Sequence, residues 1–238
     1  MVSQQELLDF FSNSADTYRF ISRMMFKELN DEAIAELAKA DYPTDTGNDC
    51  LDEGYRLLRR YFRFSGVDRR SQLACEYARI FLAAGVYTKE KRTAIPYESV
   101  FTSEEHIMMQ EARDDVVKRY RADGFKVNPD LHEPEDHLSF EFEYLANLSD
   151  RALEEAKEKD QAALRNTVER QLDFIETHLL NWVPQLREVA SSFAKLAFYL
   201  GMLYVAQGSL EQARDMLQEI LAQIDGVNEA DESGSSAA

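Results

Sequence analysis

Basic residues, glycine, proline and cysteine are all scarce in this sequence of 238 residues. Lys and Arg number 27 against 44 Asp and Glu, and the resulting formal net charge of −17 argues against a nucleic-acid partner. Glycine (9) and proline (5) are too few for the many turns of a β-rich fold. The two cysteines, Cys50 and Cys75, are too far apart for a CxxC pair. We expect both to be free thiols in or near the core.

Long apolar runs are also missing. The longest weakly polar stretch, residues 193–206, contains Lys195 and is shorter than the roughly 20 residues that a membrane helix needs. It predicts a buried core helix. The first residues lack the basic and apolar character of a secretory signal. We therefore expect a protein that stays in the cytoplasm and does not insert into a membrane.

Apolar residues recur at helical spacing through most of the chain. We predict an all-α fold without a sheet, a single large bundle-like helical domain over residues 1–224. Residues 225–238 are rich in acids, serine, glycine and alanine and predict a disordered tail. Two stretches interrupt the helical pattern, residues 86–102 and residues 123–135. Because compact domains rarely carry such loops without a purpose, both are candidates for function and for hinges.

A group of acidic and histidine side chains lies in the sequence LHEPEDHLSFEFEYL, residues 131–145. Pro134 fits the first position of a helix, where its missing N–H costs nothing. Asp136 and His137 then fall in the first turn, where the helix dipole favours the carboxylate. With Glu133 they are expected to form a polar cluster at an exposed helix start. Helix capping is the simplest role for this cluster.

An enzymatic function has little support. His132 and His137 are five residues apart with a proline between them, unlike the HExxH spacing of zinc proteases. A metal-dependent helical-bundle enzyme is therefore the weakest alternative. The sequence has no nucleophile motif, phosphate loop or dinucleotide fingerprint, so we expect no catalysis and no cofactor.

A second alternative is a generic helical interaction module of the tetratricopeptide type. One copy of its LGxxYxxxGxxxxA pattern occurs at Leu200, Gly201, Tyr204, Gly208 and Ala213. Such arrays need about three repeats to bury a continuous core, and no second copy is found. We favour a tight helix hairpin in which Gly201 permits close packing and Gly208 ends the first helix.

Three segments taken together resemble the TorD/DmsD/NarJ family of redox-enzyme maturation chaperones. They are EYARIF at residues 76–81, PYESVF at residues 96–101 and EPEDHLSFEFEYL at residues 133–145. The stretch HLLNWVP, residues 178–184, is similar to a later His, Trp and Pro pattern of that family. Each motif is weak alone, but their order in an all-helical chain of this length is fairly specific.

The resemblance implies a cytoplasmic chaperone rather than an enzyme. Such a protein binds the twin-arginine signal peptide, and often the body, of an apo molybdoenzyme subunit of the DMSO or TMAO reductase type. It holds this client protein for cofactor insertion before export. The resemblance leaves open whether the working form is a monomer or a homodimer made by domain swapping.

The resemblance also carries a client-binding site to positions in all three motifs: Glu76, Tyr77, Arg79 and Phe81; Pro96, Tyr97, Glu98 and Ser99; and Glu133, Pro134, Asp136 and His137. Arginine pairs with carboxylates and stacks on aromatic rings. Glu98, Glu133 and Asp136 are therefore expected to supply charge, and the aromatic residues of the first two motifs an apolar floor. At helical spacing, Tyr77 and Phe81 also fit the core.

Two features of the pattern stand apart. We leave His178 and Trp182 out of the site, because a structural role between helices explains them equally well. Many family members have a Gly-Pro-Gly turn after the first motif and a second proline before PYES, whereas this sequence has Gly85 alone and one proline. The connecting loop is therefore expected to be longer or more mobile than usual.

Overall fold

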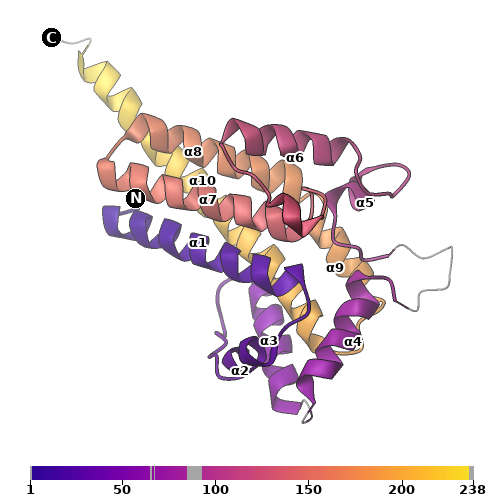
Figure 1. The fold of residues 1–238 in the computed structure, drawn as a ribbon. Helices are drawn as coiled ribbons and strands as arrows, with labels where there is room; N and C mark the ends of the chain where they lie inside the picture. Colours follow the sequence, from indigo (N-terminus) through magenta and orange to yellow (C-terminus); the bar gives the residue numbers. More distant parts are fainter. Residues whose placement is uncertain (1, 65, 67, 85–92, 236–238) are drawn as a thin grey trace.

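The structure is a computed structural model that describes residues 2–64, 66, 68–84 and 93–235, with side chains as far as residue 226. This part of the chain is all-helical and contains no strand, which confirms the predicted fold class (Figure 1). Its α-helices are α1 (Gln4–Phe26), α2 (Asp31–Leu37), α3 (Asp49–Phe64), α4 (Arg69–Phe81), α5 (Glu98–Thr102), α6 (Glu111–Ala122), α7 (Leu138–Glu158), α8 (Gln161–Phe174), α9 (Val183–Ser191) and α10 (Ala197–Ser235). A 3₁₀ turn, η1 (Pro129–Leu131), precedes α7, and a π-helical turn, η2 (Ile175–Leu179), follows α8.

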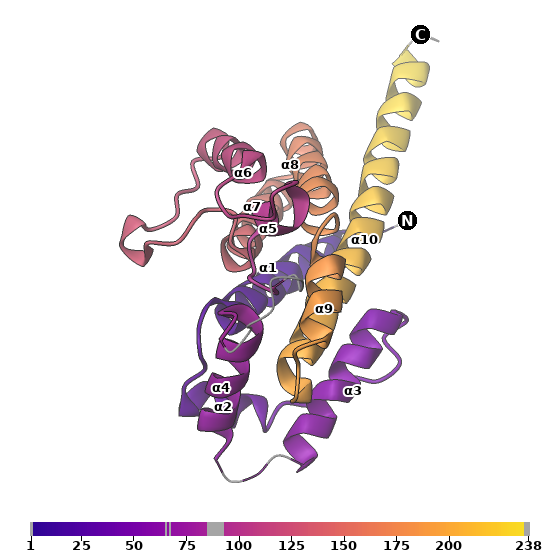
Figure 2. The same cartoon turned by 90° about the vertical axis from the view of Figure 1, so that its right-hand side faces the viewer.

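Helices α1, α7, α8 and α10 lie side by side, and α6 lies beyond α8 (Figures 1 and 2). Helices α1 and α7 are antiparallel, because Gln4 at the start of α1 donates a 2.9 Å hydrogen bond to the carbonyl of Ala156 near the end of α7. Arg19 and Asp150 form an ion pair between the same two helices. The second group of helices, α2, α3, α4 and α9, lies around the first half of α10 (Figure 2).

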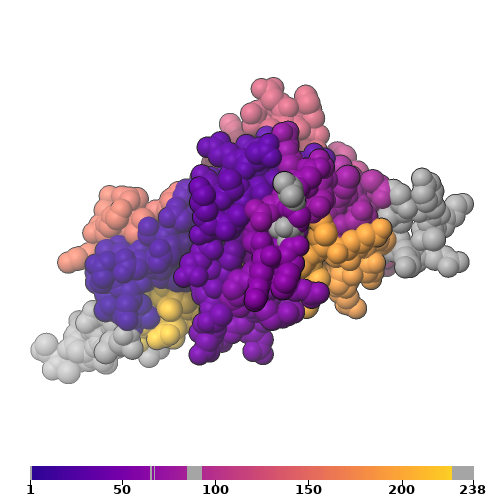
Figure 3. All heavy atoms as spheres, turned by 90° about the horizontal axis from the view of Figure 1, so that it is seen from below, coloured from indigo at the N-terminus to yellow at the C-terminus, as the bar shows by residue number. Residues whose placement is uncertain are grey.

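The first third of the chain therefore packs against its last part. Seen from below, its residues lie beside the segment that holds α9 and the start of α10 (Figure 3). Helix α3 runs along α10, and Asn48, just before α3, donates a 3.0 Å hydrogen bond to Glu211 of α10. This return closes one helical unit around a shared core.

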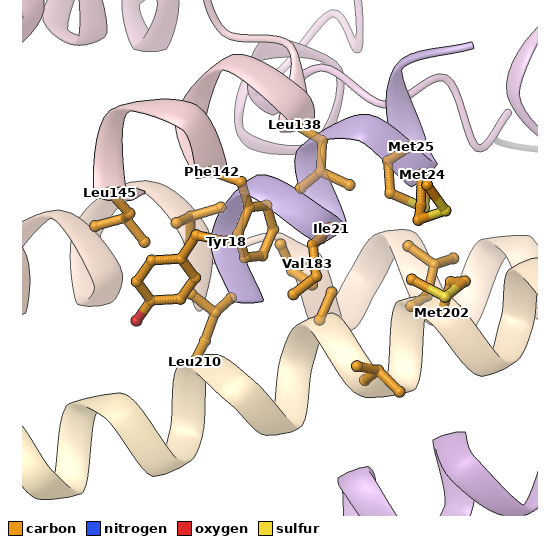
Figure 4. Close-up of a cluster of buried hydrophobic side chains, with 14 of the residues drawn as sticks. Tyr18, Ile21, Met24, Met25, Leu138, Phe142, Leu145, Val183, Met202 and Leu210 are labelled. Atoms are coloured by element: carbon orange, nitrogen blue, oxygen red, sulfur yellow. The ribbon is translucent and has the colours of Figure 1, made fainter. Parts of the chain in front are cut away.

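The core joins α1, α7 and α10. Figure 4 shows Tyr18 and Ile21 of α1 and Phe142 of α7 pointing toward Met202 and Leu210 of α10. All five are almost completely buried, and the rings of Tyr18 and Phe142 lie 5.9 Å apart. Burial of each large apolar side chain contributes roughly 1.5–3 kcal/mol, so this contact is a principal source of stability.

Helix α10 differs from the sequence prediction. It runs unbroken through Gly208, so the expected hairpin at this position is wrong. The glycines instead let α10 approach α3: a Cβ added at Gly201 would lie 3.1 Å from Leu57 Cβ, and one at Gly208 would lie 2.7 Å from the backbone nitrogen of Leu51. Glycine at these positions reflects helix contact rather than helix termination, which also removes the basis for a tetratricopeptide unit here.

The same helix offers a matched test of this contact. We expect Gly208→Ala to destabilise the protein by roughly 2 kcal/mol, because the new methyl group meets the backbone of α3. Gly226→Ala lies later in α10 with no atom within 4 Å of the added Cβ. It is expected to stabilise by about 0.5 kcal/mol through reduced chain entropy in the unfolded state. Urea unfolding measures the change in stability of each variant, which should be a loss for Gly208→Ala and a gain for Gly226→Ala. Equal changes would contradict the close contact between α10 and α3.

Helical structure extends beyond several of the boundaries predicted for the tail and the two hinges. Helix α10 continues past residue 225 to Ser235, and Figures 1 and 2 show its C-terminal part projecting beyond the other helices. The division into a helical domain and a disordered tail stays a prediction, as do the two hinges. Residues 86–92 of the first hinge lie outside the described residues, and its end forms α5. The second contains η1.

Two further expectations concern exposure. Cys50 is partly buried and Cys75 is exposed, so the prediction that both lie in or near the core is wrong for Cys75. Of the helices in the described ranges, none is both long enough and apolar enough to span a bilayer.

Candidate functional site

The second and third motifs are held together by backbone hydrogen bonds. Leu138 N–H donates to the carbonyl of Pro96 at 3.0 Å, and Glu98 N–H donates to the carbonyl of Asp136 at 3.0 Å. An isolated antiparallel bridge pairs Tyr97 with His137 between these bonds. Residues that are some 40 positions apart in the sequence therefore lie next to each other at the starts of α5 and α7.

Asp136 is the buried centre of this junction. Its Oδ2 accepts hydrogen bonds from the backbone N–H of Ser99 at 3.0 Å and from the Ser99 hydroxyl at 2.5 Å. Its side chain is completely buried, and this burial raises the pKa of the carboxyl group. Asp136 thus acts at the start of α5 and not on an exposed first turn of α7, which corrects the sequence prediction.

His137, and not a residue before it, is the N-cap of α7. Its Nδ1 accepts a 3.1 Å hydrogen bond from Ser139 N–H, so the neutral ring carries its proton on Nε2. Pro134 lies before the helix, where its carbonyl accepts from His137 N–H at 3.2 Å, so the prediction that it occupies the first helical position is wrong. The imidazole packs edge-on against Tyr97 and Phe26, with ring centroids 5.0 and 5.8 Å away.

Burial lowers the pKa of His137 from 6.5 to about 3. The unfolded chain takes up a proton at this position near pH 6.5, whereas the folded chain does so only near pH 3, so acid favours unfolding. Between pH 6.5 and pH 5 this linkage lowers the free energy of unfolding by roughly 2 kcal/mol. We expect His137→Asn, which keeps an oxygen to cap α7, to remove that part of the pH dependence. Urea titrations at pH 5 and pH 7 give the free energy of unfolding of the unaltered chain and of the variant. If this free energy changes between the two pH values by the same amount in both proteins, the assignment to His137 is contradicted.

A cleft of about 600 Å³ lies where all three motifs meet. Six of the predicted site residues line it: Tyr77, Phe81, Pro96, Tyr97, Glu133 and His137. The rest of the lining consists of Phe26, Lys27, Glu28, Leu82, Ile95 and Met108. The cleft therefore lies between the ends of α1 and α4 and the paired starts of α5 and α7.

The cleft combines an aromatic floor with exposed acids. The Tyr77 hydroxyl donates a 2.8 Å hydrogen bond to the carbonyl of Phe26 at the end of α1, which fixes this side of the floor. On the other side, the Tyr97 hydroxyl donates to the carboxylate of Glu133. Glu28 and Glu133 supply two carboxylates against the single cation of Lys27. This chemistry suits a guanidinium group, which pairs with carboxylates and stacks on aromatic rings.

A larger cavity of about 840 Å³ adjoins this cleft across the α1–α2 turn. Phe26, Lys27 and Glu28 line both. The larger cavity contains none of the twelve predicted site residues, and its acids include Glu32 and Glu36 of α2. We therefore centre the candidate site on the cleft where the motifs meet.

The structure places the other first-motif residues outside the cleft. Glu76 is completely buried, and its Oε1 accepts hydrogen bonds from the backbone N–H groups of Lys195 at 2.5 Å and Leu196 at 2.7 Å. Its Oε2 forms an ion pair with Arg79. Glu76 thus satisfies donors just before α10 and ties α4 to that helix.

Glu98 is buried behind the cleft and contacts the fourth motif. Its carboxylate lies 2.9 Å from Nδ1 of His178 and accepts a 3.0 Å hydrogen bond from the side-chain amide of Asn181. Nε2 of His178 lies 3.0 Å from Asp115 of α6. His178 therefore joins η2 to α5 and α6, a structural role between helices that accounts for its place in the motif.

Trp182 completes this buried polar layer. Its indole N–H is shared between the carbonyl of His178 at 2.6 Å and the carboxyl group of Glu141 at 3.2 Å. Glu141 is completely buried, and burial together with repulsion from Glu98 and Asp136 raises its pKa well above the ordinary range. These groups support the junction from behind and do not reach the cleft.

Sequence reasoning missed half of the cleft lining. Glu28 and Met108 belong to none of the four motifs, and Leu82 follows directly after the first. A signal was present for Leu82 and for Ile95, which are apolar residues directly next to a motif. Across the residues that the structure describes, no group of three or more His, Cys, Asp or Glu side chains is arranged to hold a metal ion.

The fold and the cleft define an all-helical protein with an aromatic and acidic cleft suited to binding a cationic ligand. Comparison with protein families agrees: residues 48–188, more than half of the chain, match the family described as nitrate reductase delta subunit. The chain belongs to this family. The resemblance to the TorD/DmsD/NarJ family of redox-enzyme maturation chaperones is thereby confirmed, and with it the class of chaperone rather than enzyme.

Individual relatives cover nearly the whole chain. The chain is 27% identical over 222 residues to the chaperone protein TorD of Vibrio cholerae, covering 91% of this chain and 97% of that protein. It is 26% identical to chaperone protein TorD of Vibrio parahaemolyticus, with 88% and 97% covered. For chaperone protein TorD of Photobacterium profundum the identity is 24%, with 82% and 89% covered.

Proposed function

We propose that this chain is a cytoplasmic chaperone that binds the twin-arginine signal peptide of a molybdoenzyme subunit and retains the subunit until its cofactor is inserted. The client is of the DMSO or TMAO reductase type. The observation that carries the proposal is the meeting of all three motifs at one cleft with two exposed carboxylates and an aromatic floor.

The peptide's two arginines fit this cleft chemically. Glu133 lies on one wall and Glu28 on another, so each carboxylate is available to one guanidinium group. Tyr77, Tyr97 and Phe26 offer ring faces and edges between the acids. The overall charge of −17 adds a long-range attraction that speeds encounter with a cationic segment.

The other residues of the predicted site support this cleft indirectly. Asp136 and Ser99 fix the start of α5, and Glu98 fixes its position against His178. Glu76 and Arg79 fix α4 against the residues before α10. We assign these residues to positioning the cleft walls and Tyr97, Glu133 and the first-motif aromatics to peptide contact.

Calorimetric titration with a synthetic signal peptide tests this function. The peptide is taken from a molybdoenzyme encoded near the gene for this chain, and a second peptide has both arginines replaced by alanine. We expect a dissociation constant in the micromolar range or tighter that weakens at least about tenfold for the alanine peptide. Equal affinities, or no binding of either peptide, would overturn the proposal.

A further inference from the structure

Two acidic side chains face each other in the buried layer behind the cleft. Glu141 of α7 is completely buried, and Glu98 of α5 is 2% exposed. Their carboxyl groups lie within hydrogen-bonding reach of each other. Asp136, which is also completely buried, adds a third carboxyl group nearby. Three ionised carboxylates in this space would repel one another strongly, because the protein interior screens charge far less than water does.

The hydrogen bonds around Glu98 and Glu141 indicate which of the two holds a proton. Oε1 of Glu98 accepts from the Asn181 amide at 3.0 Å, and Oε2 lies 2.9 Å from Nδ1 of His178. Glu141 receives only a share of the Trp182 indole N–H, which lies 3.2 Å from its Oε2. Its Oε1 is buried, and no donor of the described residues reaches it. A proton on this oxygen resolves the deficit, because a protonated carboxyl group donates where a carboxylate only accepts.

We propose that Glu141 is a neutral carboxylic acid whose O–H donates a hydrogen bond to the carboxylate of Glu98, and that this bond positions the start of α5. Glu98 is the first residue of α5 and directly follows Tyr97, which lines the cleft. The proton converts a repulsive pair of carboxylates into a hydrogen-bonded pair, so α5 can lie against α7. Its loss would push α5 and Tyr97 away from α7. Glu141 is therefore a positioning residue for the cleft, and this role rests on the proposed function.

The surroundings of Glu141 favour its neutral form. Burial and the negative charges of Glu98 and Asp136 raise its pKa well above the ordinary value of 4.5. Above pH 4.5 the unfolded chain has lost this proton while the folded chain keeps it, so raising the pH favours unfolding until Glu141 ionises in the folded state. Other titratable groups around the pair are Tyr120 of α6, His178 of η2 with Asp115 of α6 behind it, and Tyr18 of α1, which packs against the neighbouring Phe142.

Infrared spectroscopy at pH 7 tests the protonation of Glu141 directly. A neutral carboxylic acid has a C=O stretching band that is separate from the carboxylate bands and shifts when its proton is exchanged for deuterium. We expect this band in the unaltered chain and its loss in Glu141→Gln. Glu143→Gln, a change at a partly exposed position on the same helix, should keep it. Absence of the band from the unaltered chain, or its persistence at full intensity in Glu141→Gln, would overturn the proposal.

Urea unfolding at pH 7 and pH 9 gives a second readout of the same proton. Between these pH values, the equilibrium constant for unfolding of the unaltered chain should rise at least about tenfold more than that of Glu141→Gln, which cannot ionise. Glu143→Gln should respond to pH as the unaltered chain does. An equal response of Glu141→Gln and the unaltered chain would overturn the assignment of the proton to Glu141.

Calorimetric titration with the signal peptide at pH 7 tests the positioning role. Glu141→Gln keeps an N–H donor for Glu98 and should bind like the unaltered chain, whereas Glu141→Leu lacks a donor and should bind about fivefold more weakly. Circular dichroism verifies that both variants are folded. Equal binding by the two variants would overturn the positioning role. If the unaltered chain does not distinguish the arginine peptide from its alanine form, the proposed function itself has failed, and the infrared band still decides whether Glu141 is neutral.

Discussion

Replacing Glu76 with alanine is expected to lower the free energy of unfolding by roughly 3–5 kcal/mol. The buried carboxylate accepts the backbone N–H groups of Lys195 and Leu196 and pairs with Arg79. Its removal leaves two donors without an acceptor and a partly buried cation without its counterion. Because these donors precede α10, which packs along α3, the loss is transmitted to the contact between the two groups of helices.

The control for this variant has the same sequence spacing but not the same burial. Glu53 and Arg56 form an i,i+3 ion pair like that of Glu76 and Arg79, but on the exposed surface of α3. Glu53→Ala is expected to change the stability by no more than about 0.5 kcal/mol. Urea unfolding followed by circular dichroism compares the stabilities of Glu76→Ala and Glu53→Ala. A loss below 1 kcal/mol for Glu76→Ala would show that Glu76 does not anchor α10.

Replacing His178 with alanine is expected to cost a similar amount, roughly 3–5 kcal/mol. The imidazole lies between Glu98, which is almost completely buried, and Asp115. Without it, the carboxylate of Glu98 loses the contact with the ring nitrogen that faces its Oε2 and retains the hydrogen bond from Asn181. The penalty is therefore mainly that of a buried charge left without its partner. His132→Asn, at an exposed position outside this layer, should stay within about 0.5 kcal/mol of the unaltered chain.

A double variant separates that penalty from lost packing. If an uncompensated charge is the cause, Glu98→Gln introduced together with His178→Ala should recover part of the stability that His178→Ala loses. Denaturation of the two single variants and the double variant completes the cycle. A loss for the double variant equal to the sum of the losses of the two single variants would show that the two side chains do not act on each other.

The sequence was sufficient to predict helices, because apolar residues at helical spacing need only local information. It failed where a residue's role is set by a distant segment. Gly208 has the appearance of a helix breaker, yet its missing side chain makes room for α3, as that of Gly201 was expected to do. Pro134 and Asp136 have the appearance of a helix start, yet pairing with residues 96–98 buries Asp136 and moves the first turn to Leu138.

The same limit applies to the candidate site. The motifs predicted Tyr97 and Glu133, which contact each other in the structure. They did not predict Glu28, because this residue comes from the turn after α1 and only the packing of α1 on α7 brings it to the cleft. Nor did they separate Glu76, which supports α10, from Tyr77, its neighbour in the chain, which lines the cleft. The burial and the hydrogen-bond partners of Glu76 and Tyr77, and not their residue types, distinguish these two roles.

The central claim is that peptide arginines pair with carboxylates of this cleft, and two neighbouring acids provide its most direct test. Glu133 lines the cleft, whereas Glu135 pairs with Arg113 outside it. Calorimetric titration with the signal peptide should give a dissociation constant roughly fivefold weaker, about 1 kcal/mol, for Glu133→Gln. Glu135→Gln should bind like the unaltered chain, and the alanine peptide should not distinguish the two variants. Unchanged binding by Glu133→Gln, or equal weakening by Glu135→Gln, would contradict the account.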